Sequence, residues 1–266
     1  MNSRLLTVVL VAALGVAFQG NQGAAQKNGG EVQKEADAKT QYAAASLLRK
    51  QIRGKKGTER RQAQMKAAAA YEAVAHYFSE EAPLAGRALY KAAELHEYLR
   101  DRENGVRCLK QIFKMHAESN TKAKAHNLLG HIYRRARNFK EAIKEYDLCI
   151  QDFPKEKAQV AVAMIWLGKC KATSGDHKGA RETWQKRLEQ FADRSRLVIE
   201  SYDLIACSYL REGKTEKARE TLTRCQDQFK AAAQDSGPEG QRIRKWLGKM
   251  KVVKRLMGST EKRDDS

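Results

Sequence analysis

The sequence predicts an all-α protein, an α-α superhelix of about four to five stacked helical hairpins with a capping helix at each end. Three observations predict it: a pattern of small and large residues that recurs about every 38 residues, a second pattern between its copies, and the composition. Only three residues of the 266 are proline and 31% are charged. This balance favours helices over sheets.

The first pattern is a small residue, a large apolar or aromatic residue four places later, and an aromatic residue or histidine seven places after that. Its copies begin 38, 37, 38 and 38 residues apart. They are Ala67-Tyr71-Phe78, Gly105-Leu109-His116, Ala142-Tyr146-Phe153, Ala180-Trp184-Phe191 and Ala218-Leu222-Phe229. Five copies at one period favour a repeat array over unrelated hairpins.

The second pattern lies between these copies and has a spacing of three, one and three residues, which places its members on one face of a helix. The copies are Leu89-Ala92-Ala93-His96, His126-Leu129-Gly130-Tyr133, Met164-Leu167-Gly168-Lys171 and Tyr202-Ile205-Ala206-Tyr209. We expect the small residue to allow close approach of the partner helix. Polar breaks, such as residues 137–138, 174–176 and 212–214, predict the turn inside each hairpin.

These residues carry a family resemblance. Leu129-Gly130, Tyr133, Ala142, Tyr146 and Pro154, with Trp166-Leu167-Gly168 and Ala180 in the next copy, resemble the tetratricopeptide repeat over roughly residues 60 to 232. The period is near 38 rather than the usual value of about 34. Longer repeats of this kind are similar to those of exported bacterial envelope proteins of the Tol-Pal and outer-membrane assembly type. The resemblance implies stacked hairpins and a concave groove that binds a partner peptide or helix.

The first residues indicate export. Arg4 precedes a run of fourteen uncharged residues, Leu5 to Phe18, and small residues follow up to Ala25. This is typical of a secretory signal peptide over residues 1–25, and the run is shorter than the roughly 17 to 25 residues that span a bilayer. No cysteine that could take a lipoprotein acyl chain precedes Cys108. We therefore expect a soluble protein of the periplasm or cell envelope, without a transmembrane segment after cleavage.

The mature chain divides into four expected parts. They are an N-terminal helix and basic linker over 26–60, the repeat domain over 61–232, a C-terminal capping helix over 233–257, and a disordered tail over 258–266. The net charge of +19 is concentrated at the flanks, because residues 49–66 carry +7 and residues 241–263 carry +8. Such basic ends fit anionic lipid head groups, an acidic envelope polymer or an acidic protein, and simple solubility remains an alternative. Nucleic acid is disfavoured, because no exposed aromatic residues are expected among these charges.

The expected function is non-enzymatic binding of a partner. The resemblance implies that the first helix of each hairpin lines the groove. The groove-facing residues of the second repeat unit are distinctly basic. Arginine binds oxyanions bidentately and asparagine supplies donors, so an acidic peptide or helix is the expected partner. The candidate partner-binding residues are Lys124, Asn127, His131, Arg134, Arg135, Arg87, Tyr90 and Lys169. A solvated face without a ligand is the alternative, and a role for the basic ends in binding an anionic surface is the other candidate function.

No catalytic, cofactor or metal site is predicted. Residues 54–58 lack the spacing of a phosphate-binding loop, and His126 and His131 lie five residues apart, where two imidazoles do not share a helix face. His96, His116 and His126 are expected in the core, as are the aromatic residues Trp166, Trp184, Tyr146 and Tyr209. Cys149 and Cys170 lie on consecutive helices and could pair in an exported protein. The partner, the pathway and the oligomeric state do not follow from the sequence.

Overall fold

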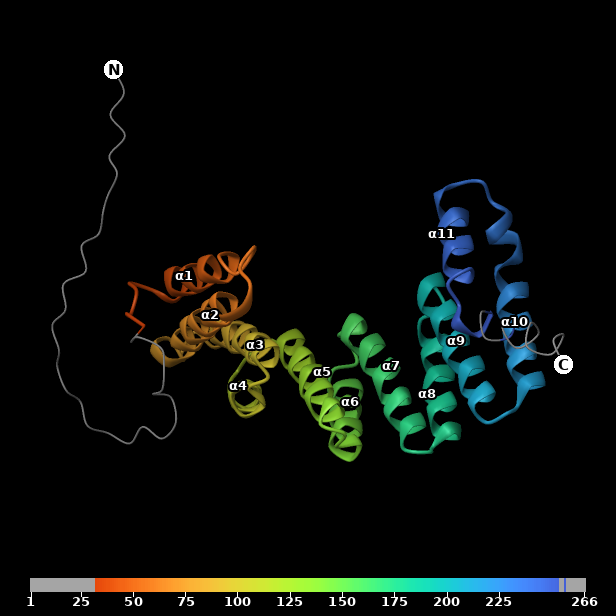
Figure 1. Ribbon diagram of the computed structural model, residues 1–266, viewed down its shortest axis with the longest axis horizontal. Helices are drawn as coiled ribbons and strands as arrows, with labels where there is room; N and C mark the ends of the chain where they lie inside the picture. The colour runs from red at the N-terminus through yellow and green to blue at the C-terminus, as the bar shows by residue number, and fades with distance from the viewer. Residues whose placement is uncertain (1–31, 254–255, 257–266) are drawn as a thin grey trace, which may run out of the picture. The chain divides into compact units, whose positions relative to one another are not determined.

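The computed structural model describes residues 32–253 and residue 256, and this part of the chain contains helices and no strands (Figure 1). The predicted signal peptide and the tail over 258–266 lie outside the described residues. The helices are α1 (Ala38–Lys50), α2 (Gly57–Tyr77), α3 (Ala82–Leu99), α4 (Arg102–Lys114), α5 (Ser119–Arg135), α6 (Phe139–Asp152), α7 (Lys157–Thr173), α8 (His177–Gln190), α9 (Ser195–Arg211), α10 (Thr215–Gln234) and α11 (Pro238–Leu247). The predicted all-α fold is confirmed.

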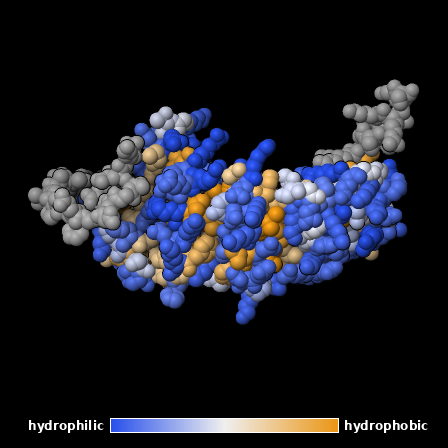
Figure 2. Space-filling model, turned by 90° about the horizontal axis from the view of Figure 1, so that it is seen from below, coloured by the Kyte–Doolittle hydropathy of each residue, from blue (hydrophilic) through white to orange (hydrophobic). Residues whose placement is uncertain are grey.

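The helices pack as successive hairpins. Each helix contacts the next one along the chain, and each odd-numbered helix from α1 to α9 also contacts the next odd-numbered helix. The odd-numbered helices therefore lie side by side in one layer, and the predicted repeat solenoid is confirmed. Figure 2 shows one face of the molecule, where hydrophilic residues cover most of the surface and hydrophobic residues gather in bands between them. None of the described helices is long and apolar enough to cross a membrane.

The turn repeats in atomic detail in the four hairpins α3–α4, α5–α6, α7–α8 and α9–α10. One residue with positive φ ends the first helix, and the N–H of the following residue donates to a carbonyl oxygen five residues before it, which is the Schellman arrangement. The residues with positive φ in these four turns are Arg100, Arg137, Gly175 and Gly213. The donors are Asp101, Asn138, Asp176 and Lys214. Asp101, Asn138 and Asp176 also cap the second helix with their side chains.

We expect Arg137→Gly to raise the free energy of unfolding. Arg137 has a φ of 60° in the left-handed region, where a side chain with a Cβ is strained and glycine is not. The gain should be about 0.5–1 kcal/mol, because the greater flexibility of glycine in the unfolded chain offsets part of it. Urea denaturation measures the change. Gly175→Ala, at the equivalent turn with φ of 91°, should lower the free energy of unfolding. A lower free energy of unfolding in both variants would mean that the backbone at Arg137 is not strained.

Small residues on the first helices admit large aromatic side chains from the second helices. A Cβ built on Gly130 would lie 2.5 Å from Cε1 of Tyr146, and one on Gly168 would lie 2.3 Å from Nε1 of Trp184. Tyr146 and Trp184 are fully buried, as predicted. The close approach that the sequence predicted at these glycines is thus present in two successive hairpins.

One of the three histidines that were expected in the core needs correction. His96 and His126 are buried, but His116 is exposed. The reason is that α4 ends at Lys114, so His116 lies beyond the helix and Ala117 is the buried residue there. Cys149 and Cys170 are buried free thiols, without the disulfide that the sequence left open.

One buried position breaks the apolar pattern of the second helices. Val74, Ile112, Cys149 and Cys225 occupy equivalent buried positions, whereas the fourth repeat has Arg187, which is 0% exposed. Its guanidinium forms four contacts: with the carbonyl oxygens of Ala161 (3.1 Å) and Leu197 (2.8 Å), with the Ser201 hydroxyl (2.8 Å), and with the Glu200 carboxylate (2.8 Å). Arg187 therefore connects α8 with α7 and α9.

The C-terminal segment caps the array. Met250 and Val252 are buried in a cluster with residues of α9, and the N–H of Val252 donates to Oδ1 of Asp203 at 2.8 Å. The sequence predicted one capping helix over 233–257, whereas α10 continues to Gln234 and the helix that follows is the shorter α11, Pro238–Leu247. Lys251 of this segment lies close enough to Lys169 of α7 to lower the pKa of that lysine.

Candidate functional site

Four side chains of α5 and α7 meet on the layer of odd-numbered helices. The Arg134 guanidinium carbon lies 4.2 Å from the centre of the Trp166 ring, and the Lys169 Nζ lies 4.4 Å from it. The His131 ring meets Trp166 edge-on, with centroids 5.2 Å apart. We call Trp166, His131, Arg134 and Lys169 the Trp166 cluster. Cations over an indole ring are attracted by its electron-rich face and held in place.

The local sequence explains this convergence. His131 and Arg134 are three residues apart on α5, and Trp166 and Lys169 are three apart on α7, so each pair shares a helix face. Because α5 contacts α7 directly, the two faces meet. Asn127 reinforces this contact: its Nδ2 donates to the backbone oxygen (3.1 Å) and to Oε1 (3.2 Å) of Gln159.

Positive charge accumulates around the cluster. Burial lowers the pKa of Lys169, and Lys251, Arg134 and Arg187 lower it further, whereas Glu200 opposes them. Burial, with help from Arg134 and Arg135, lowers the pKa of His131 to about 4. His131 is therefore neutral at pH 7, and its Nδ1 lies 2.6 Å from the Tyr146 hydroxyl. The charge of the cluster at neutral pH comes from Arg134 and Lys169.

The cations of the cluster have hydrogen-bond donors that are not used within the described part of the protein. The Nε of Arg134 is buried without a hydrogen-bond partner. Within the described part of the chain, neither Arg134 nor Lys169 forms an ion pair with a carboxylate within 4.0 Å. Since cations of folded proteins commonly pair with carboxylates when one is near, two cations that contact one indole ring without such an ion pair suit an anionic ligand.

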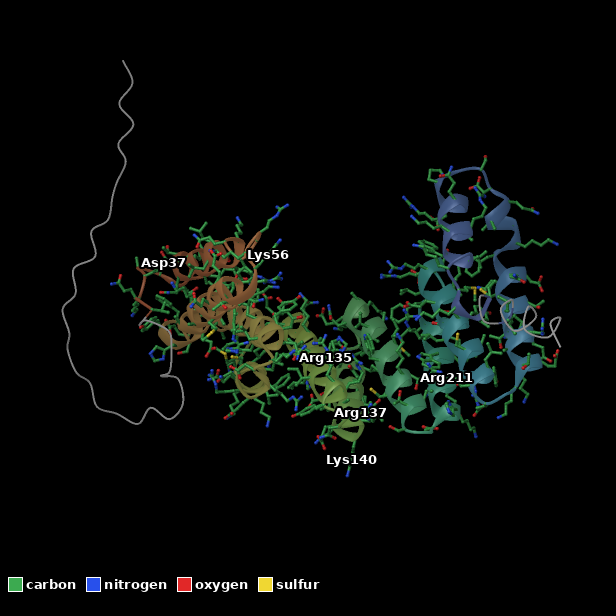
Figure 3. The ribbon with its side chains drawn as sticks, in the orientation of Figure 1. Asp37, Lys56, Arg135, Arg137, Lys140 and Arg211 are labelled. Atoms are coloured by element: carbon green, nitrogen blue, oxygen red, sulfur yellow. The ribbon has the colours of Figure 1, made fainter. Side chains whose placement is uncertain are left out.

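The remaining candidate residues lie outside the cluster. Arg135 pairs with Glu97 of α3, and Figure 3 shows it where α5 passes α3. Lys124 is half-buried near Glu156, whose pKa is lowered by hydrogen bonds from Ser119 and Asn120 and also by Lys124. The donors of Asn127 are occupied by Gln159, as described above.

Arg87 and Tyr90 belong to a different group of residues on α3. Arg87 is exposed and its Nε donates to the Pro83 carbonyl oxygen at 3.3 Å. Burial and the nearby Glu94 raise the pKa of Tyr90. Of the eight sequence candidates, the structure therefore brings together His131, Arg134 and Lys169.

Sequence reasoning did not assign Trp166 or Lys251 to the candidate site. Trp166 was expected in the core, but it is only half-buried, and two cations lie over its ring. Tyr209, which was also expected in the core, is half-buried too, and the Arg181 guanidinium lies 4.3 Å from the centre of its ring. A usable signal existed, because Trp166 precedes the core residue Leu167 and so points about 100° away from it on the helix. Lys251 was counted only as part of a basic terminus, since nothing in the sequence shows that its segment folds back against α9.

Comparison with family models gives two matches. Both models are described as tetratricopeptide repeat, and they match residues 123–151 and 200–231. These two segments are therefore each similar to a tetratricopeptide repeat. The first match covers most of α5 and most of α6, and it includes the cluster residues His131 and Arg134.

Solved structures with tetratricopeptide-like folds agree with these matches. The crystal structure of MamA protein superposes with a TM-score of 0.55 at 16% identity, covering 75% of this chain and 96% of that one. A crystal structure of nearly identical TPR-like repeats from Podosopora anserina gives 0.55 at 16% identity, covering 76% and 100%. At such identities the likeness concerns the fold alone. Comparison with curated proteins gives no match.

Proposed function

We propose that this protein is a non-enzymatic protein-interaction scaffold of the bacterial periplasm or cell envelope that binds an acidic peptide or helix across the Trp166 cluster. Tetratricopeptide repeats suggest protein partners. The observation that carries the proposal is that Arg134 and Lys169 both lie over one indole ring, and among the described residues neither has a carboxylate within 4.0 Å. The apolar run before residue 25 supports export.

The physical basis is preorganisation. Stacking on Trp166 fixes two long side chains that would otherwise lose rotamer freedom on binding, which lowers the entropic cost of capturing a carboxylate. The Arg134 guanidinium can bind a carboxylate bidentately, and Lys169 adds a second positive charge at the same ring. Lys251 extends the positive field and should raise the association rate of an acidic partner.

The test compares two double charge reversals of equal size. A labelled glutamate-rich helical peptide is titrated against the full chain and followed by fluorescence anisotropy. Arg134→Glu with Lys169→Glu should weaken binding by at least about tenfold, since each reversal replaces attraction by repulsion at a partly desolvated site. Lys140→Glu with Lys144→Glu changes the net charge equally on exposed positions of α6, and Figure 3 shows Lys140 projecting beyond the α5–α6 turn. If the two double variants lost the same amount of peptide affinity, the Trp166 cluster would not be the binding site.

A second candidate function is binding of an anionic lipid surface or polymer through the basic ends. Its support is exposure: Arg53, Lys56 and Arg60 are exposed, and Figure 3 shows Lys56 at the α1–α2 turn. Binding of this kind falls steeply with ionic strength, because the charges lie in water. Binding to vesicles of anionic lipid that is lost in Arg53→Glu with Lys56→Glu, but kept in the cluster variant, would favour this candidate.

A further inference from the structure

Three side chains with metal-binding chemistry meet between α2, α3 and α4, away from the Trp166 cluster. A carboxylate oxygen of Glu72, an imidazole nitrogen of His96 and the Cys108 Sγ lie within 4.8 Å of one another. Each of the three helices supplies one donor. We propose that Glu72, His96 and Cys108 form a binding site for a divalent zinc ion, because Zn²⁺ is the metal that binds thiolate, imidazole and carboxylate together in tetrahedral sites.

The surroundings of the three donors are those of a metal site. The His96 Nε2 lies 2.6 Å from Oε1 of Glu72, and its Nδ1 lies 3.2 Å from Oδ2 of Asp101. This Nδ1 is buried and has no hydrogen bond of good geometry. With zinc on Nε2, the imidazole proton resides on Nδ1 and faces the Asp101 carboxylate. Metal-bound histidines almost always donate their second ring nitrogen in this way, which fixes the ring and strengthens the ligand.

Glu72 is also held as a metal ligand would be. Its Oε2 accepts a hydrogen bond from the Arg107 guanidinium, which leaves Oε1 on the side of His96. Ligating carboxylates are commonly hydrogen-bonded through their second oxygen. Arg107 therefore orients Glu72 and does not occupy the oxygen assigned to zinc.

Charge balance favours a metal at this place. Cys108 is 0% exposed and His96 is 8% exposed, so an isolated charge here would be costly. One Zn²⁺ with one thiolate and one carboxylate is neutral in sum. Binding releases the thiol proton to solvent, and the neutral imidazole keeps its proton on Nδ1. Three protein ligands leave a fourth position of the tetrahedron to water.

The chain contains a matched pair that lacks the thiol. His126 Nδ1 lies 2.7 Å from Oε2 of Glu145, and His126 is also 8% exposed. Its ring stacks on Phe113, with centroids 4.3 Å apart, and no cysteine completes a set. Among the described residues, Glu72, His96 and Cys108 are the group that brings three metal-binding side chains together. The second pair therefore serves as an internal control for a histidine–glutamate contact that only stabilises the fold.

The experiment uses the untagged full chain, freed of metal with a chelator and kept reduced. Zn²⁺ is titrated in competition with a chromophoric chelator, and Co²⁺ is added separately as a spectroscopic probe. The wild type should bind one Zn²⁺ per chain and show a thiolate-to-cobalt charge-transfer band. Cys108→Ala, His96→Gln and Glu72→Gln should each weaken Zn²⁺ binding by more than about 100-fold, and Asp101→Asn by about 10- to 100-fold. Asparagine keeps the helix cap that Asp101 provides to α4.

The controls are His126→Gln and Cys149→Ala, which remove an imidazole and a buried thiol elsewhere. Both should bind Zn²⁺ like the wild type. A wild type without the charge-transfer band, or one that binds Zn²⁺ no more tightly than Cys108→Ala, overturns the proposal. So does an equal loss in His126→Gln. The cobalt spectrum of the wild type decides the matter even where a variant does not fold.

Discussion

Arg187→Ala should lower the free energy of unfolding by about 3–5 kcal/mol, because a large buried side chain and its hydrogen bonds are lost together. Arg187 is 0% exposed, and its removal takes a guanidinium donor away from the carbonyl oxygens of Ala161 and Leu197 and from the Ser201 hydroxyl. It also leaves a cavity between α8 and its neighbours on both sides, which adds to the loss. Urea denaturation followed by circular dichroism measures the change.

Arg187→Met is the matched control, because methionine fills most of the space without a charge. Glu200 is 41% exposed, so its carboxylate can turn into water once its partner is gone. The equivalent position in the other second helices holds Val74, Ile112, Cys149 or Cys225, which shows that this fold accepts an apolar residue there. We expect Arg187→Met to cost clearly less than Arg187→Ala. Equal denaturation midpoints for the wild type and the alanine variant would contradict a structural role for the guanidinium.

The sequence predicted the fold because the residues that pack against each other in a hairpin recur at the same spacing along the chain. Gly130 with Tyr146 and Gly168 with Trp184 recur at one spacing, and each pair is a direct contact in the structure. The turns were predicted only as polar breaks. Their left-handed residues include Arg100 and Arg137, which carry side chains that do not favour positive φ, so residue type alone could not place them.

The candidate site was predicted in part, for a different physical reason. A helical periodicity states which residues share a face of one helix, and it placed His131 and Arg134 together correctly. It does not state which residue of the next helix lies opposite. Trp166 therefore remained in the predicted core although it lies under Arg134, and Glu72, His96 and Cys108 were not connected because each lies on a different helix.

The neighbouring helices also determine which contacts a charged residue makes. Arg134 and Arg135 are adjacent in the sequence and have the same chemistry. Arg135 forms an ion pair with Glu97, whereas Arg134 stacks on Trp166. Reversal of Arg135 would break a contact between α3 and α5, so Arg134 with Lys169 gives the cleaner test of binding.

Acidification should destabilise the protein through His131. The pKa of His131 is lowered from 6.5 to about 4 by burial first, and by Arg134 and Arg135. As pH falls, the unfolded chain takes up this proton before the folded chain does, so the stabilisation is complete above pH 6.5 and is lost as pH falls towards about 4. The loss should amount to about 3 kcal/mol over this range.

The comparison with His131→Gln isolates this effect from other groups that titrate in the same range. Burial raises the pKa of Asp203, for example, but Asp203 is present in both proteins and cancels in their difference. Urea denaturation of both proteins at a series of pH values from 7 to 4 gives that difference directly. Because glutamine does not titrate, the wild type should lose its advantage over the variant, or fall below it, as pH approaches 4. A difference that stays constant with pH would mean that the folded protein takes up the proton on His131 as readily as the unfolded chain.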